Sequence, residues 1–228
     1  MRYRYLLIIF SCLVAPSYGN WFSSQKKAAR TIIMLNPHGD AAHAGRSIED
    51  SFERGITLQI AEYLKLRLEE HYPHVTVLLT RMPGEIIEPL HNAQCANRIS
   101  PFMYISIHCY EEKNPLPHVY LYTFSYGNSF FNPSKELSLY RYDQAHLLSK
   151  QKSAEISNIF ANALKREEYN RCCIVEDVIA LPFKPLLGIT CPAFAVEIGL
   201  AQKKDWHMIA APFLEGIQTV LNTSIVIN

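Results

Sequence analysis

The segment TIIMLNPHG, residues 31–39, indicates how the chain starts to fold. Its first five residues are a continuous apolar run, and Asn-Pro follows directly. A short apolar run bounded by Pro and Gly is typical of a buried strand, and Pro37 disfavours a helix at this point. The next residues, 38–50, are rich in Gly, Ala, Asp and Ser. The segment therefore predicts a buried strand followed by a loop that begins with His38.

An amphipathic helix is expected after this loop. Apolar residues recur every four positions on one face, while charged residues occupy the other face: Ile56, Ile60, Leu64 and Leu68. This periodicity predicts a helix of about five turns. Ser51 is expected to cap its N-terminus, Glu53 falls in its first turn, and Pro73 ends it.

Strand and helix patterns alternate through the rest of the chain. Apolar runs predict strands at 75–79, 102–108, 118–124, 175–179 and 193–198, and helical periodicity covers 90–99, 144–169 and 207–221. Residues 125–143 are expected to form a loop. Such alternation predicts an α/β domain with a mostly parallel, twisted sheet of about six strands flanked by helices.

Length and composition exclude several classes of protein. The 228 residues fit one domain with an ordinary core. The chain is 49% apolar and 19% charged, which argues against disorder. The formal net charge is only +1, so no basic field indicates a nucleic-acid partner, and none is expected.

The first residues have the order of a signal peptide. Arg2 and Arg4 precede a short apolar run, and small residues follow it up to Gly19. The run is short for a transmembrane helix, so an uncleaved anchor is disfavoured. Lipidation of Cys12 is disfavoured too, because the apolar run continues past it. Contact with the membrane is expected only through this segment before cleavage.

The sequence predicts that the chain has three parts. Residues 1–19 are expected to be a signal peptide and residues 20–30 a polar tether. The catalytic domain is expected to cover residues 31–228. Export places the protein in the periplasm or outside the cell.

The cysteines carry little information about function. Five remain after Cys12 leaves with the signal, and no two of them have C-x-x-C spacing. We expect most of them to be small buried hydrophobic residues, with at most one or two disulfides.

Four residues could converge into one site. His38, His108 and Glu197 each stand at or just past the end of a predicted strand, where open α/β sheets place their sites. Glu53 opens the helix after the His38 loop. Two imidazoles and one carboxylate suit a three-ligand zinc site. Such an ion lowers the pKa of water to about 7, and a second carboxylate could move the proton.

Each of these residues also has an ordinary structural explanation. The chain has nine histidines, so a single one is more often solvated or buried with a partner than a ligand. An acidic residue in the first turn of a helix is stabilised by the helix dipole, so Glu53 could have this ordinary role alone. Glu197 lies in an apolar strand, where a charge is costly unless it is paired or functional. It could be half of a structural ion pair with an Arg or a Lys.

Five motifs in order resemble the zinc-dependent N-acetylmuramoyl-L-alanine amidases of the amidase 3 type. The resemblance runs from about residue 31 to the C-terminus, and five motifs in the right order are far more specific than one. The motifs are Leu35-Asn36-Pro37-His38-Gly39, Glu53-Arg54-Gly55, Val77-Leu78-Leu79-Thr80-Arg81, Ala96-Asn97 with Tyr104-Ile105-Ser106-Ile107-His108, and Cys191-Pro192-Ala193-Phe194-Ala195-Val196-Glu197-Ile198-Gly199.

The resemblance implies a peptidoglycan hydrolase. It implies cleavage of the amide between N-acetylmuramic acid and L-alanine of the stem peptide. It implies one Zn2+ per chain, held by His38, Glu53 and His108, and Glu197 as the acid/base. Some relatives carry a helix that blocks the zinc until an activator protein removes it, and the only obvious insertion here that could play this blocking role is 125–143.

Several positions depart from the family pattern. Pro37 directly precedes the first histidine, and Asp40, Asn92, Cys109-Tyr110 and Leu187 replace the residues usual there. His43 is a spare ligand if the loop is shifted. These changes motivate an alternative: a catalytically weak or inactive amidase-fold protein that binds or regulates the cell wall. Another zinc peptidase, cutting within stem peptides, is a third hypothesis.

Overall fold

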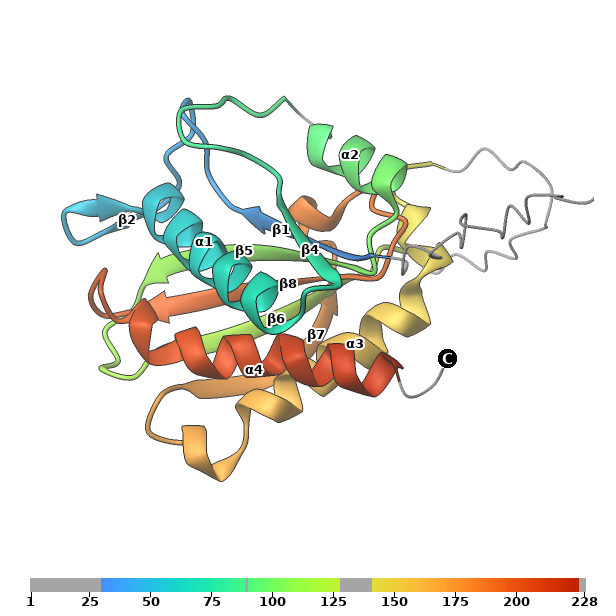
Figure 1. Ribbon diagram of the computed structural model, residues 1–228. Helices are drawn as coiled ribbons and strands as arrows, with labels where there is room; N and C mark the ends of the chain where they lie inside the picture. The colour runs from blue at the N-terminus through green and yellow to red at the C-terminus, as the bar shows by residue number, and fades with distance from the viewer. Residues whose placement is uncertain (1–29, 89, 128–140, 226–228) are drawn as a thin grey trace, which may run out of the picture.

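A computed structural model describes residues 30–88, 90–127 and 141–225 (Figure 1). The expected signal peptide, nearly all of the expected tether, and most of the 125–143 insertion lie outside these residues. The predictions made for them therefore stay predictions.

The described chain forms one six-stranded sheet in the order β4-β1-β5-β8-β6-β7. The strands are β1 (Thr31–Pro37), β4 (Val75–Leu79), β5 (Met103–Glu111), β6 (His118–Phe124), β7 (Ile174–Leu181) and β8 (Ala193–Leu200). Four of them, β4, β1, β5 and β8, are parallel neighbours. The predicted α/β class and the mostly parallel six-stranded sheet are confirmed.

The strand β6 breaks the parallel arrangement. It pairs antiparallel with β8 and parallel with β7. Only residues 112–117 join β5 to β6, which is too short for the crossover that a parallel partner needs. The chain therefore turns back at the carboxyl end of β5. This reversal places Tyr120 opposite Glu197 in the register of β6 and β8.

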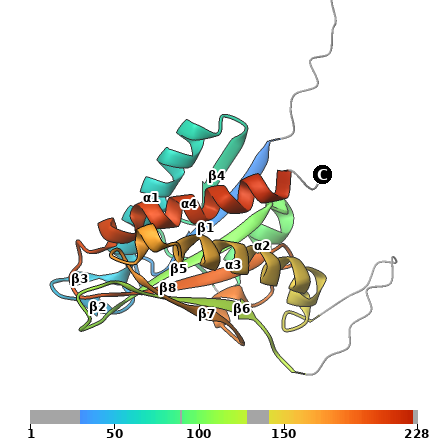
Figure 2. The same ribbon diagram turned by 90° about the horizontal axis from the view of Figure 1, so that it is seen from below.

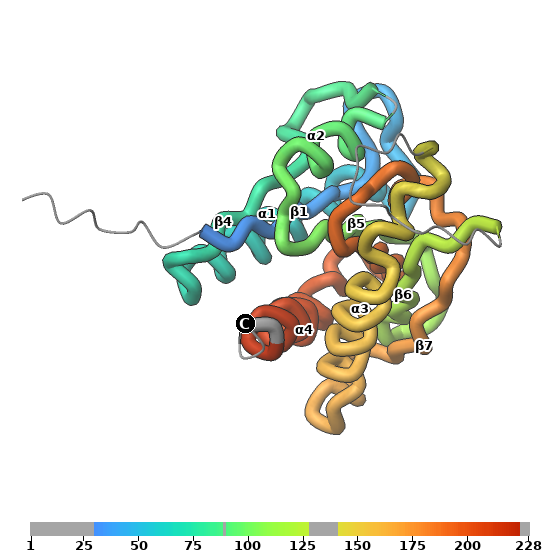
Figure 3. The backbone as a smooth tube through the Cα atoms, turned by 90° about the vertical axis from the view of Figure 1, so that its right-hand side faces the viewer, coloured from blue at the N-terminus to red at the C-terminus, as the bar shows by residue number. Residues whose placement is uncertain are grey.

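Helices cover the two faces of the sheet unequally. The elements are α1 (Glu53–His71), α2 (His91–Ile99), α3 (Lys150–Leu164) and α4 (Trp206–Ile225). Side chains of α1, α3 and α4 share one buried apolar cluster with the sheet, and those of α2 share a second cluster with its other face. Figure 2 shows α3 and α4 alongside each other, and Figure 3 shows α2 on the opposite side of the molecule from them.

The expected cap at Ser51 is wrong. Ser51 lies in the short strand β3 (Ser51–Phe52), which pairs with β2 (Ser47–Ile48). Phe52 occupies the cap position without a side-chain hydrogen bond. The backbone of the preceding loop replaces the cap, because the carbonyls of Arg46 and Ala44 accept hydrogen bonds from the first amides of the helix. The loop and the helix start are thus one hydrogen-bonded unit.

Some boundaries also differ from the predictions. The helical stretch predicted over 144–169 is three pieces: the 3-10 turns Ala145–Leu148 and Glu167–Tyr169 with α3 between them. A further 3-10 turn, Lys184–Leu186, follows β7. The strands β5 and β8 continue past the predicted ends. His108 and Glu197 therefore lie within strands rather than in the crevice beyond them.

The cysteines and helices agree with the composition. All five cysteines among the described residues are free, and three are buried: Cys109, Cys173 and Cys191. Within the same part of the chain, no helix has the length and apolar character needed to cross a membrane.

Candidate metal centre and its neighbouring carboxylate

Three chain segments bring His38, Glu53 and His108 together. Pro37, the last residue of β1, pairs with Ile107 of β5, and the amide of His38 donates to the Ile107 carbonyl at 2.9 Å. The next residues on the two strands, both histidines, are therefore neighbours, with ring centroids 4.3 Å apart. Glu53 arrives from the first turn of α1. The sequence prediction that these residues converge agrees with this geometry.

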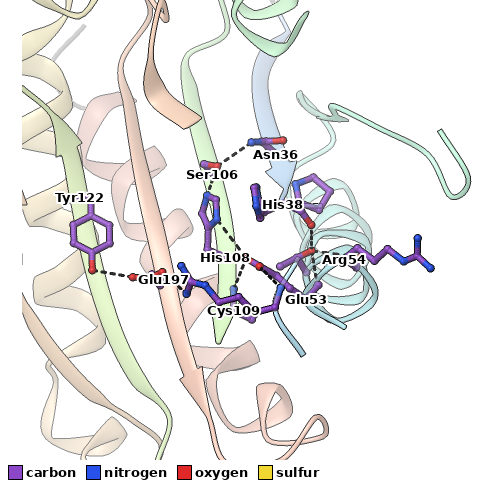
Figure 4. Close-up of polar contacts among 12 residues, drawn as sticks. Asn36, His38, Glu53, Arg54, Ser106, His108, Cys109, Tyr122 and Glu197 are labelled. Carbon is purple, nitrogen blue, oxygen red and sulfur yellow. Dashed lines mark hydrogen bonds and ion pairs between the residues drawn. The ribbon is translucent and has the colours of Figure 1, made fainter. Parts of the chain in front are cut away.

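The three side chains offer a compact set of ligand atoms. One atom from each lies within 4.8 Å of the others. Nδ1 of His108 is 3.4 Å from Oε1 of Glu53, and both side chains are almost fully buried (Figure 4). This is the only such group of three or more His, Cys, Asp or Glu found among the described residues.

Protonation favours metal binding by this set. Burial and the neighbouring His108 lower the pKa of His38 to about 4, so its imidazole is neutral at pH 7 and has a lone pair available. Burial alone would raise the pKa of Glu53. The hydrogen bond from His108, the charge of His38 and the amide of Arg46 together hold that pKa below its usual value. The carboxylate of Glu53 is therefore anionic at neutral pH.

Backbone amides fix both oxygens of Glu53. Oε1 accepts from the amide of Cys109 at 3.1 Å, and Oε2 accepts from the amide of Arg46 at 3.1 Å. Gly45 lies against the same carboxylate with φ of +77°, and a Cβ there would come within 2.6 Å of Oε2. Only glycine fits this position without displacing Glu53.

A buried hydrogen-bond chain orients His108. Its Nε2 is 2.8 Å from Oγ of Ser106, which accepts from Nδ2 of Asn36 at 2.9 Å. Oδ1 of Asn36 in turn accepts from Thr80 and Asn92. The contact between Nε2 and Ser106 holds the ring so that Nδ1 faces Glu53. The network thus fixes the orientation of the His108 ring.

The loop around His38 is stabilised by two buried charges. The carboxylate of Asp40 accepts from the amides of Ala42, His43 and Ile87, and these bonds hold its pKa at about 2 although burial alone would raise it. The guanidinium of Arg81 donates to the carbonyls of Pro37 and His38. The Asp40 carboxylate and the Arg81 guanidinium therefore hold the backbone of this loop in place.

His43 does not join the ligand set. Its side chain is 80% exposed, and Nδ1 lies 3.2 Å from Oδ1 of Asp40. Gly39 supplies one positive φ of this loop, at +83°. His38, and not His43, therefore lies beside His108.

Glu197 stands beside this cluster on the adjacent strand. It pairs in register with His108 in the parallel ladder of β5 and β8. Its Oε1 accepts from Nη1 of Arg46 at 2.6 Å, and its Oε2 accepts from the hydroxyl of Tyr122 at 2.9 Å. Burial and this hydrogen bond raise the pKa of Tyr122, so the phenol is protonated and donates at neutral pH. The ion-pair explanation of Glu197 is thus also present in the structure.

Phe183 joins the two halves of the site. Its ring stacks on Tyr122 at 4.9 Å and meets His108 edge-on at 5.0 Å. It precedes the 3-10 turn Lys184–Leu186 and forms an apolar wall there. Such a wall limits the access of water to the ring of His108.

Sequence reasoning missed the residues that support the four candidates: Asn36, Arg46, Ser106, Tyr122 and Phe183. Asn36 and Ser106 stood inside quoted motifs, so their alternation with His38 and His108 was available as a signal. Nothing in the sequence pointed to Arg46 and Tyr122, because only the loop geometry and the reversal of β6 bring these two residues to Glu197.

The chain belongs to the N-acetylmuramoyl-L-alanine amidase family known as amidase 3. The family model matches residues 33–212. All four candidate residues lie within that match. No curated protein sequence matches the chain.

Solved structures share this fold. The catalytic domain of CwlV, an N-acetylmuramoyl-L-alanine amidase from Bacillus (Paenibacillus) polymyxa, is 15% identical with a TM-score of 0.61, over 84% of this chain and 98% of that one. Ami1 from Mycobacterium smegmatis is 14% identical with a TM-score of 0.62, over 86% and 98%. The CwlD amidase from Clostridioides difficile, solved with the GerS lipoprotein, is 18% identical with a TM-score of 0.59, over 85% and 100%.

Proposed function

We propose that this chain is a zinc-dependent amidase that cleaves peptidoglycan between N-acetylmuramic acid and L-alanine of the stem peptide. The observation that carries the proposal is the compact cluster of His38, Glu53 and His108 with Glu197 on the adjacent strand. The chain's family gives the substrate class.

The donor set fits one zinc ion. Zinc takes imidazole nitrogen and carboxylate oxygen at about 2.0–2.2 Å, so ligand atoms around one ion lie at most about 4 Å apart. The separations within 4.8 Å require only small side-chain rotations to reach that range. When bound, the ion supplies Lewis acidity, which polarises the scissile carbonyl and makes water a better nucleophile. We assign His38, Glu53 and His108 as its ligands.

Glu197 is proposed as the acid/base. Its carboxylate would take the proton of the attacking water and pass it to the nitrogen of L-alanine as the amide breaks. Arg46 and Tyr122 each hold one of its oxygens and so define its position. Ser106 hydrogen-bonds Nε2 of His108 and so keeps the orientation of that ring.

The setting of the reaction is proposed from the sequence and the family. Peptidoglycan lies in the cell envelope, and a signal peptide over 1–19 followed by a tether over 20–30 would deliver the domain there. An activator protein is a proposed partner, because the CwlD amidase was solved in complex with the GerS lipoprotein.

Product identification tests the activity. Purified protein would be incubated with intact peptidoglycan, and soluble products identified by mass and by N-terminal labelling. The proposal predicts stem peptides with a free L-alanine amino terminus and intact muramic acid on the glycan. Cleavage within stem peptides would show another peptidase, and no release would favour the inactive wall-binding alternative.

A further inference from the structure

Arg46 occupies a position that the reaction scheme does not explain fully. It lies in the loop between His38 and α1, next to both acidic residues of the site. Its backbone amide donates to Glu53, and its side chain reaches Glu197. Arg46 therefore contacts both Glu53 of the candidate metal centre and the carboxylate of Glu197.

The loop holds the backbone of Arg46 rigidly. Its carbonyl accepts from the amide of Glu53 at 2.8 Å, which complements the bond from its own amide to that side chain. Two residues on, Ile48 is fully buried. The tip of the β2–β3 hairpin is tied to the turn between β8 and α4 by the bond between Lys203 and Asp50. The base of the side chain is thus fixed before any ligand arrives.

The guanidinium itself stays open to solvent. The side chain of Arg46 is 52% exposed, whereas that of Glu197 is 13% exposed. Among the described residues, its only side-chain hydrogen bond is the one from Nη1 to Glu197. Its Cζ lies 5.7 Å from the centroid of the Tyr110 ring, which supports it from one side. An arginine has five N–H donors, so most of its donors remain for a ligand.

This arrangement differs from that of a purely structural partner. The structural arginine of the same site, Arg81, is 5% exposed and uses Nε and Nη2 on backbone carbonyls. Arg46 instead presents a fixed, half-exposed fork beside the proposed reacting centre. Such a fork binds carboxylates in a defined geometry.

We propose that Arg46 is a specificity-determining residue that binds a carboxylate of the stem peptide while it holds Glu197. The ligand class is an acidic peptide whose free carboxylate lies close to the scissile amide. No bond is made or broken at Arg46; it positions the substrate relative to Glu197. This inference rests on the proposed function for the identity of the peptide.

Binding of two matched peptides tests the inference without turnover. The probes are stem tripeptides that start with L-alanine and differ only in a free carboxylate or a carboxamide on the second residue. Calorimetry on the full, zinc-loaded chain would give the two dissociation constants. We expect the carboxylate peptide to bind about tenfold more tightly, because a charge-assisted hydrogen bond replaces a neutral one.

Variants of Arg46 identify the source of that preference. Arg46→Gln should bring the ratio of the two constants close to one. Arg46→Lys should keep part of it, because it keeps the charge but loses the fork. The matched control is Arg67→Gln, which breaks a similar exposed pair with Glu70. Arg67 lies about 20 Å along α1 from Glu53, so this variant should leave the ratio unchanged.

The outcomes separate this inference from the proposed function. A ratio near one in the wild type, or a ratio that survives Arg46→Gln, overturns it. If the chain prefers the carboxylate peptide but releases no peptide from peptidoglycan, the carboxylate site is supported and the proposed amidase activity is refuted. The same two peptides can also be joined to muramic acid and assayed as substrates. If both are cleaved, Arg46→Gln should lower kcat/KM more for the carboxylate form than for the carboxamide form. We expect this extra decrease to come from a higher KM rather than from a lower kcat.

Discussion

The candidate metal centre (His38, Glu53 and His108) and the surroundings of Glu197 meet at the adjacent strands β5 and β8 but are built differently. His108 and Glu197 are partners in one parallel ladder. The cluster is held by buried groups that lie within the sequence motifs themselves, such as Asn36 and Ser106. Glu197 is held by Arg46, which is 151 positions away and half exposed, and by Tyr122 on the reversed strand.

This contrast teaches how one site can separate two tasks. A metal ligand must stay in one geometry, and buried, fully bonded side chains provide that. A proton-transferring carboxylate must meet both water and substrate, so its partners stand at the open side. Substitutions in the two regions should therefore affect metal affinity and turnover independently.

The largest effect is expected at His108. His108→Ala removes one of three proposed ligands and leaves Glu53 buried without its partner, so the variant should hold no zinc and show no detectable turnover. Elemental analysis and peptide release measure the two quantities. His43→Ala is the matched control and should keep both, since that side chain is exposed. One zinc per chain in His108→Ala would contradict the ligand set.

Glu197→Gln should separate the regions most clearly. The amide keeps the shape but cannot accept the proton, so kcat should fall by about 10²–10⁴ while zinc content stays at one per chain. Glu176→Gln alters a carboxylate on β7 that pairs with His118 and should retain full activity. Normal turnover in Glu197→Gln would show that Glu197 is only the structural ion-pair partner of Arg46.

Ser106→Ala tests the support beneath the cluster. Loss of the hydroxyl removes the hydrogen bond that orients the His108 ring, and zinc affinity should fall by about 10–100-fold. Competition with a chelator measures that change. Ser157→Ala is a suitable control, because Ser157 is equally buried but bonds within α3. Equal zinc affinities in the two variants would argue against the network.

Tyr122→Phe should give the smallest effect. It removes one hydrogen bond to Glu197, which corresponds to roughly a tenfold lower kcat with unchanged zinc affinity. Tyr72→Phe, whose hydroxyl meets Asn222 instead, serves as the control. A change in zinc affinity rather than in kcat would show that the two regions are not separable.

The same division explains what the sequence could predict. The strand ends at His38 and His108 follow from apolar runs and an α/β class that fixes strand direction, so their proximity was predictable. The helix start at Glu53 was predictable as well, although its cap was not, because loop carbonyls replaced the Ser51 side chain.

The Glu197 side was less accessible to such reasoning. The apolar strand marked the carboxylate as unusual but could not name its partners. Tyr122 reaches it only because the short 112–117 connection reverses β6. Arg46 reaches it only because Gly45 and the β2–β3 hairpin turn the loop toward β8. Long-range placement of this kind leaves no periodic trace in the sequence.

Reloading of the metal-free chain with zinc tests the central claim most directly. The purified protein would be stripped with a chelator, titrated with zinc, and assayed at each step for peptides released from peptidoglycan with a free L-alanine amino terminus. The account predicts no release from the stripped chain, a linear rise with added zinc, and a plateau at one equivalent per chain. Release by the metal-free chain, or zinc uptake at one equivalent without any release of such peptides, would contradict it.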